Sequence, residues 1–317
     1  MTTKSIYLKD IRPGEKISES FLVTEKNLAF SQKGAPYLNL RLKDKTGEVE
    51  AKIWDNADEL GKRFKRGDVV RVNARAVSYK NVLQLSILDV ELLSQTDVNP
   101  VDYFPVARRD IDDMYAEMMS HVEKINTSCL KSLLESFFKD DAIAVMFKKA
   151  PAAKSLHHIY VGGLLEHTLS VVRLLEIVAD HYPGVDKDIL ITGGLLHDIG
   201  KIHELSYDRV VDYSDEGRLI GHIVIGLEML DKKIAGLADF PESLAMELRH
   251  LLLSHHGTHE FGSPKRPKTL EALIVHHVDD LDAKVNTFQT YIEESVAEEE
   301  SKWTPFHRLL ERFIYKG

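Results

Sequence analysis

The chain has a single cysteine, Cys129, among its 317 residues, so it can form no intramolecular disulfide. No charged amino terminus leads into an apolar stretch of the kind that begins a secretory signal. The longest apolar runs, 189–196 and 223–230, are interrupted by Gly, Thr or Glu and are too short to cross a bilayer. These absences exclude a disulfide scaffold and argue against a membrane protein, and we expect a cytoplasmic location.

Charge is distributed unevenly along the chain. The net charge of −9 argues against indiscriminate binding of nucleic acid, yet residues 1–95 carry 17 Lys and Arg against 13 Asp and Glu. The rest of the chain carries 24 against 37. Because this length, with 44% hydrophobic residues, is enough for two cores, we expect a basic amino-terminal domain and an acidic carboxy-terminal one.

Short runs of alternating apolar residues, separated by turn signals, fill the region from about Ile17 to Leu93. Residues 36–42 and 49–54 predict a hairpin, a polar helix follows through Phe64, and two more strands are predicted near 69–77 and 82–92. Five strands with a helix between the third and fourth are typical of an OB-fold barrel. We therefore expect residues 1–95 to be an OB-fold nucleic-acid-binding domain.

Basic and aromatic side chains are interleaved in this barrel. Such a surface holds single-stranded nucleic acid by phosphate attraction and base stacking, which contributes about 1–3 kcal/mol per base. The alternative is that the aromatics fill a small barrel and the charges solvate it. We expect Trp54 and Phe64 in the core and Lys33 and Tyr37, which flank a loop, as substrate contacts. The basic residues are Lys26, Lys33, Arg41, Lys43, Lys52, Arg71 and Arg75, and the other aromatics are Phe30 and Tyr79.

Residues 96–109 contain two prolines and little periodicity, and they form the predicted linker. Helical patterning resumes near Asp110, with scaffolding segments around 111–125 and 129–147. The stretch from Trp303 to Tyr315 is expected to pack back as a terminal helix. The predicted fold is therefore multidomain, a five-stranded OB-fold barrel followed by an all-α domain over residues 110–317.

Thirteen of the 15 histidines fall between positions 157 and 277. Any one of them taken alone would be read as an ordinary core or surface residue, but several occupy apolar helical faces. Counting back from His255 by four and seven residues meets two leucines, His167 lies between Leu164 and Val171, and Asp279 shares a face with Val275. A carboxylate that faces a core needs a partner, and a metal ion held between helices would supply one.

An adjacent His-Asp pair, His197 and Asp198, ends the apolar run that contains Gly193 and Gly194. Imidazole and carboxylate together favour a borderline transition ion or manganese. We expect the two glycines to admit a neighbouring backbone and Gly200 to end a helix.

The segments 157–168 and 197–201 resemble the HD-domain superfamily of metal-dependent phosphohydrolases, and the His255-His256 doublet is similar to that of its dinuclear members. More narrowly, the two segments resemble the YhaM-type 3′-to-5′ exoribonucleases, which also carry an amino-terminal OB-fold. The resemblance covers nearly the whole chain. It implies an all-α HD domain and a hydrolase that shortens single-stranded RNA, with single-stranded DNA left open as a further substrate.

With this resemblance we expect a centre of two divalent ions. The first would be held by His167, His197, Asp198 and Asp279, and the second by Asp198, His222 and His255, with His256 left open as a further ligand. Mn²⁺ is favoured, with Co²⁺, Fe²⁺, Zn²⁺ and Mg²⁺ as alternatives. Two ions about 3.5–4 Å apart can activate water and stabilise both the attacking and the leaving oxygen of an in-line displacement.

Other polar residues near the motif are candidates for lesser roles. Lys201, one helical turn beyond His197, resembles the family's phosphate-contacting lysine and is, with Asp198, a candidate catalytic residue. Asp279 is preferred as a ligand over Asp280 and Asp282 because of its helical face and because it resembles the family's final aspartate, which stands two residues before a Leu. His157, His158 and Tyr160 are candidate substrate contacts, and His181, His203, His250, His259, His276 and His277 are assigned to ordinary positions.

Three other functions stay open at this point. The chain could hydrolyse a free nucleotide, with the OB-fold serving assembly or regulation. It could be an oxygenase with a non-haem di-iron centre, or a binding protein whose metal is only structural. The expected partners are single-stranded RNA or DNA; no membrane partner is expected, and a homo-oligomer is left open.

Overall fold

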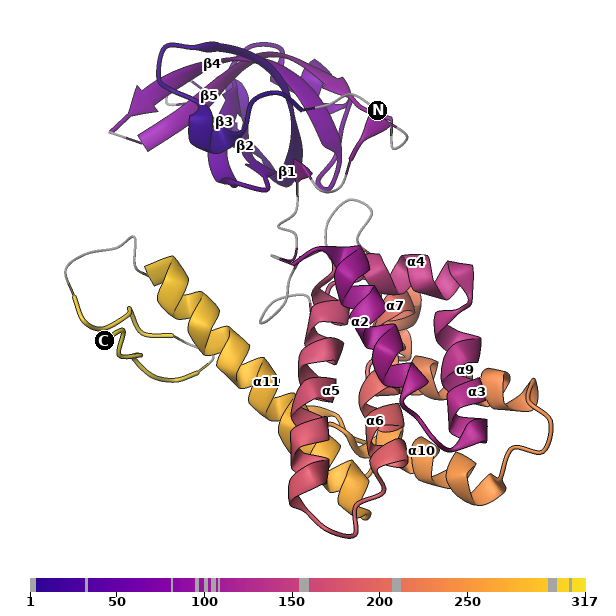
Figure 1. Cartoon of the computed structure of the whole chain (residues 1–317). Coiled ribbons are helices and arrows are strands. Elements are labelled where there is room, and N and C mark those ends of the chain that lie inside the picture. The colour runs from indigo at the N-terminus through magenta and orange to yellow at the C-terminus, as the bar shows by residue number, and fades with distance from the viewer. Residues whose placement is uncertain are drawn as a thin grey trace. The chain divides into compact units, whose positions relative to one another are not determined.

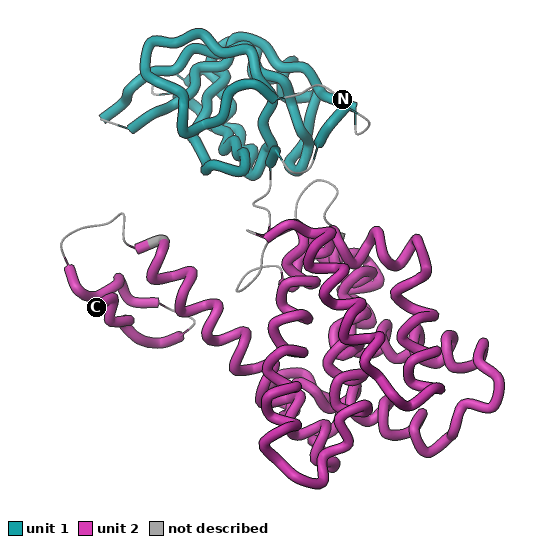
Figure 2. The backbone as a smooth tube through the Cα atoms, in the orientation of Figure 1, with its two compact units in different colours: residues 1–106, 206–211 teal, residues 107–205, 212–317 magenta. Residues whose placement is uncertain are grey.

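The computed structural model describes residues 4–31, 34–80, 82–94, 97–99, 102–103, 107, 109–153, 160–206, 212–295, 301–307 and 310–317. It divides into two compact units, residues 1–106 with 206–211 and residues 107–205 with 212–317 (Figure 2). No helix in the described ranges is long and apolar enough to cross a membrane.

The first unit is a closed five-stranded barrel, and it confirms the predicted OB-fold (Figure 1). Around the barrel the strands follow the order β1, β2, β3, β5, β4, with β3 and β5 parallel and the other pairs antiparallel. The helix α1 connects β3 to β4, as expected. The bounds are β1 Lys16–Phe30, β2 Pro36–Asp44, β3 Gly47–Ile53, α1 Ala57–Gly61, β4 Val69–Tyr79 and β5 Val82–Leu92.

Alternate residues of each strand fill the barrel, because successive side chains of a strand point to opposite faces. Along β3, for example, Val49, Ala51 and Ile53 are buried. Phe64 is buried with them, which confirms its place in the core. The expectation for Trp54 was wrong, since it is 48% exposed. β3 ends at Ile53, so Trp54 follows the last inward position of the strand.

Part of the predicted linker packs against the barrel. Tyr103 is 3% exposed, and its hydroxyl donates to the hydroxyl oxygen of Ser20 over 2.8 Å. The hydroxyl of Tyr7 donates to Asp102 over 2.7 Å. These residues therefore extend the amino-terminal unit beyond residue 95.

The second unit is helical and has the architecture expected of an HD domain. α5, α6 and α11 lie side by side and pack against one another (Figure 1). The segment predicted around 129–147 forms two helices, because Asp140 interrupts it and caps the second with bonds to two backbone N–H groups. The helices are α2 Ile111–Glu123, α3 Ser128–Phe138, α4 Asp141–Lys149, α5 Gly163–His181, α6 Lys187–Leu196, α7 Lys201–Glu204, α8 Asp215–Leu219, α9 His222–Ala235, α10 Glu242–Ser254 and α11 Leu270–Ser295, and a two-stranded ribbon joins β6 Leu205–Ser206 to β7 Asp212–Tyr213.

The carboxy-terminal segment is not the helix that the sequence predicted. Isolated β-bridges join Trp303 to Tyr315 and His307 to Arg312, and the backbone N–H of Thr304 donates to the carbonyl of Ile314 over 2.8 Å. The rings of Trp303 and Tyr315 lie 5.1 Å apart across the two segments. Cross-strand aromatic pairs of this kind stabilise extended backbone, which outweighs the helical periodicity of the segment.

Candidate metal centre and nucleic-acid interface

The histidines and aspartates predicted as ligands converge between the ends of several helices. His197 is the C-cap of α6, His222 is the first residue of α9, and His255 is the C-cap of α10. His167 lies on the buried face of α5, and Asp279 lies on α11. Residues far apart in the sequence therefore meet at one place within the helical unit.

Glycines allow these helix ends to approach closely. A Cβ at Gly200 would lie 2.1 Å from the carbonyl oxygen of His222, so only glycine lets the start of α7 touch α9. Gly200 does not end a helix by a left-handed turn, as the sequence suggested, but precedes α7 with a φ of −64°. A Cβ at Gly193 would lie 2.2 Å from the side chain of Leu251, so the neighbour that this glycine admits is a side chain and not a backbone.

Asp198 lies at the centre of the cluster and directs its two oxygens to two groups of histidines. Its Oδ2 lies 3.6 Å from Nε2 of His167 and 3.3 Å from Nε2 of His197. Its Oδ1 lies 3.5 Å from Nε2 of His222 and 3.6 Å from Nε2 of His255. One carboxylate thus faces two groups of histidines, one with each oxygen.

Two sets of donors have ligand atoms within 4.8 Å of one another. In the first set, Oδ1 of Asp279 lies 3.1 Å from Nε2 of His167 and 3.8 Å from that of His197. In the second set, the ring centres of His255 and His256 lie 4.4 Å apart. The first set is His167, His197 and Asp279, and the second is Asp198, His222, His255 and His256.

The Nδ1 atom of each of these histidines is within hydrogen-bond distance of an oxygen. Those of His197 and His255 lie 2.7 Å from backbone carbonyl oxygens, and that of His256 lies 2.8 Å from another. A carbonyl oxygen can only accept, so each Nδ1 carries the hydrogen and each Nε2 keeps its lone pair. His167 and His222 face carboxylates instead, those of Asp282 and Glu204.

Three buried atoms of the cluster have no hydrogen-bond partner among the described residues: Oδ1 of Asp198 and Nε2 of His222 and His255. An unsatisfied buried polar group costs about 1–3 kcal/mol. All three are electron-pair donors that point into the second set. A divalent cation is the group that fits them, since imidazole nitrogen and carboxylate oxygen are both metal ligands.

The pKa values of His255 and His256 agree with a cation in the second set. Burial, together with the neighbouring His255, lowers the pKa of His256 to about 4, and burial also lowers the pKa of His255. Both imidazoles are therefore neutral and able to bind a cation. Burial opposes the charged form of His167, but hydrogen bonds to Asp279 and Asp282 outweigh it and raise its pKa to about 9. The surroundings of His167 thus favour a positive charge.

Lys201 points into the same site. Its Nζ lies 2.6 Å from Oδ2 of Asp198, and its side chain is 12% exposed. Burial would raise the pKa of Asp198, but the ammonium of Lys201 and the ring of His197 hold it well below the usual range. Lys201 therefore keeps the central carboxylate ionised and places a positive charge beside the candidate ions.

The remaining predicted site residues are placed as follows. His157, His158 and Lys33 lie outside the described residues. The hydroxyl of Tyr160 donates to the carboxylate of Glu166 on α5. Asp280 is not at the site, because it pairs with Lys284 one turn along α11. Asp282 was weighed as a ligand and set aside for Asp279, although it shares a helical face with it. Glu204 was not among the candidates, but it follows Lys201 by one turn, so spacing could have raised it.

An exposed aromatic group lies on the barrel. The rings of Tyr37 and Trp54 are stacked with centres 4.6 Å apart. The ammonium of Lys52 lies 5.8, 5.4 and 5.9 Å from the ring centres of Tyr37, Trp54 and Tyr79. Trp54 and Tyr79 are 48% and 56% exposed. We call these four residues the aromatic platform, and their faces and charge suit the bases and phosphates of a single strand.

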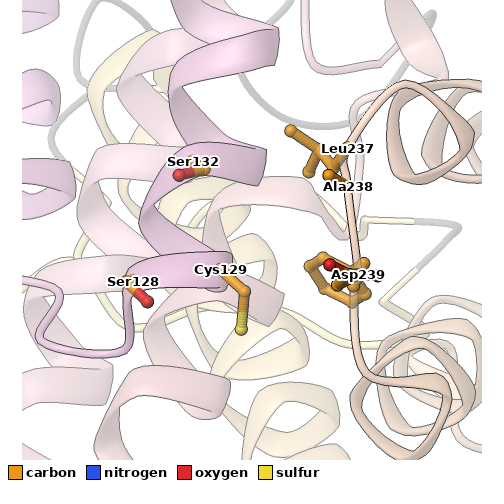
Figure 3. Close-up of a pocket in the computed structure, with 7 residues that line it drawn as sticks. Ser128, Cys129, Ser132, Leu237, Ala238 and Asp239 are labelled. Atoms are coloured by element: carbon orange, nitrogen blue, oxygen red, sulfur yellow. The ribbon is translucent and has the colours of Figure 1, made fainter.

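A pocket of about 350 Å³ lies elsewhere in the helical unit, between α3 and the loop before α10 (Figure 3). Cys129 and Asp239 are among the residues that line it. It holds none of the histidines or aspartates of the two sets, so the candidate chemistry lies outside this pocket.

Comparison with known proteins matches both units. Residues 164–284 match the family model of the HD domain, and residues 22–93 match that of the OB-fold nucleic acid binding domain. The chain is 33% identical over 291 residues to the 3′-5′ exoribonuclease YhaM of Bacillus subtilis (strain 168), covering 92% of this chain and 91% of that protein.

Two solved structures are similar to part of the chain. The second OB-fold domain of replication protein A from Methanococcus maripaludis is 18% identical with a TM-score of 0.24. The match covers 28% of this chain and 94% of the chain of that domain. The mitochondrial single-stranded DNA binding protein Rim1 from S. cerevisiae is 19% identical with a TM-score of 0.24. The match covers 26% of this chain and 97% of the Rim1 chain.

Proposed function

The chain belongs to the family of the 3′-5′ exoribonuclease YhaM, and from this we infer that it is a hydrolase that shortens single-stranded RNA from its 3′ end with divalent metal ions. The match extends over the barrel and the helical unit together, so the inference covers the whole chain and not the HD domain alone. One observation carries the chemical part: Asp198 directs one oxygen to each of two groups of histidines.

We propose that these groups hold two ions. Asp198 would bridge them, with His256 as a further ligand of the second ion. Of the candidate metals, Mn²⁺ suits a mixed imidazole and carboxylate set best. When bound, the ions supply the Lewis acidity that activates water and offsets the charge that develops on the phosphate. The first ion would be held by His167, His197 and Asp279 together with Asp198, and the second by Asp198, His222, His255 and His256.

The residues of the chain hold and orient the substrate. The side chains of His167, His197 and His255 are fully buried, so bulk water is excluded from these three rings. Lys201 places its ammonium where it can neutralise a phosphate oxygen beside Asp198. A centre enclosed by helix ends accepts a strand terminus more easily than the middle of a strand, which agrees with exonucleolytic cleavage.

The barrel would hold the strand while its end is cleaved. The aromatic platform stacks bases, and Lys52 attracts phosphates. Because the two units are parts of one chain, binding at the barrel makes the second contact at the metal centre intramolecular and raises the local concentration of the 3′ end.

The proposed function is tested by restoring activity to metal-stripped protein. We expect no hydrolysis of 3′-labelled single-stranded RNA without added metal, and the fastest hydrolysis with Mn²⁺ among Mn²⁺, Co²⁺, Fe²⁺, Zn²⁺ and Mg²⁺. A parallel reaction with single-stranded DNA of the same sequence measures the preference for RNA. Hydrolysis of free nucleotides but of neither strand would favour the nucleotide phosphohydrolase, and oxygen consumption by the iron-loaded protein would favour the oxygenase.

A further inference from the structure

In each of the two donor sets, one histidine differs from the others in the hydrogen-bond partner of its Nδ1. Nδ1 of His167 lies 2.7 Å from Oδ2 of Asp282, and Nδ1 of His222 lies 2.9 Å from Oε1 of Glu204. The other three histidines face neutral backbone carbonyls. Each set therefore has one histidine, and only one, that is backed by a carboxylate among the described residues.

We propose that Asp282 and Glu204 are positioning residues that each control the affinity of one cation position, Asp282 through His167 and Glu204 through His222. A carboxylate that accepts the Nδ1 hydrogen fixes the orientation of the ring and makes Nε2 a stronger donor. The proposal rests on the proposed metal centre, but not on whether RNA is the substrate.

Asp282 is held so that it serves His167 and not an ion directly. Its Oδ2 accepts from His167, and its Oδ1 accepts from the hydroxyl of Ser170, one turn along α5. Both oxygens are thus engaged with α5. Asp279 lies one turn earlier on α11, with its Oδ1 3.1 Å from Nε2 of the same ring. The ring of His167 is held between two carboxylates of one helix, one at each nitrogen.

Glu204 serves His222 by two bonds to one oxygen. Oε1 accepts from Nδ1 of the ring over 2.9 Å and from the backbone N–H of His222 over 3.0 Å. The second bond satisfies the first N–H of α9, which has no capping side chain at Gly221. Glu204 is 8% exposed. Its backbone packs against Gly217, where a Cβ would lie 2.2 Å from the carbonyl oxygen of Glu204. The carboxylate is therefore fixed by the fold rather than by the ion.

The test uses the full-length protein with Asp282→Asn, Glu204→Gln and both changes together. Both substitutions keep the shape of the side chain and remove its charge. Binding of Mn²⁺ to the metal-stripped proteins is followed by the loss of the free-ion electron paramagnetic resonance signal, which needs no substrate. We expect each single variant to weaken one of two bound ions by about 10- to 100-fold and leave the other unchanged, and the double variant to weaken both.

Asp280→Asn is the matched control, because Asp280 lies on α11 two residues before Asp282 but pairs with Lys284. It should leave both affinities unchanged. The proposal is overturned if either single variant weakens both ions equally or neither, if wild type binds one ion only, or if the variants lower the melting temperature of metal-free protein without changing Mn²⁺ affinity. If the affinities shift as expected but wild type does not cleave RNA, the proposed function fails and the assignment of Asp282 and Glu204 stands.

Discussion

Replacement of Asp198 by Asn is expected to abolish hydrolysis of single-stranded RNA and to lower the number of bound metal ions. The reason is the shared position of this carboxylate, whose two oxygens face both sets of histidines. Asn keeps the volume but loses the negative charge and one of the two acceptor oxygens. Bound metal is measured by elemental analysis of the purified variant, and hydrolysis with labelled RNA.

The variant also separates chemistry from binding. Because the aromatic platform lies on the barrel, affinity for a long single strand should stay within about twofold of wild type, as Asp198 makes no contact there. Asn is preferred to Ala since removal of the whole side chain would leave the buried ammonium of Lys201 without its partner. Asp280→Asn serves again as a control on α11. Full activity of Asp198→Asn would remove the proposed centre from the mechanism.

Replacement of both Tyr37 and Trp54 by Ala is expected to weaken binding of a long single strand by at least about tenfold. The two rings are stacked 4.6 Å apart and present exposed surface, so their loss removes stacking worth about 1–3 kcal/mol for each base. Hydrolysis of a very short oligonucleotide should be retained, because it engages only the metal centre. Fluorescence anisotropy with labelled RNA measures the affinity for the long strand, and single-turnover cleavage measures hydrolysis of the short oligonucleotide.

Leu88→Ala is the control for the platform, since Leu88 is a 70% exposed apolar residue of the same barrel that stacks on no ring described here. It should change neither affinity nor turnover. Equal affinity of the Tyr37 and Trp54 variant and of wild type for a long strand would move the nucleic-acid contact away from this surface.

The parts of the molecule that follow from local periodicity could be predicted from the sequence. Alternation of apolar residues gave the barrel strands, since one face of each strand must fill a small core. Helical spacing put His255 on the buried face of its helix, and the His-Asp pair identified the family. The structure brings the predicted ligands together, while their role as ligands stays a prediction.

Other features depend on contacts that spacing does not contain. Asp279 and Asp282 share one face of α11, and only the position of His167 decides that one meets Nε2 and the other Nδ1. Trp54 was expected in the core and was included in the predicted strand 49–54, but the strand ends one residue earlier, at Ile53. The contact of Gly200 with α9 is likewise set by a helix more than twenty residues away.

The direction of cleavage is the most direct test of the proposed exonucleolytic hydrolysis from the 3′ end. Metal-loaded protein is incubated with 5′-labelled linear RNA and, in parallel, with a circular RNA of the same sequence. We predict a ladder of progressively shorter labelled products from the linear RNA, with degradation stalling at a stable stem. The circular RNA should remain intact. Immediate release of the labelled 5′ nucleotide, or cleavage of the circle, would contradict this prediction.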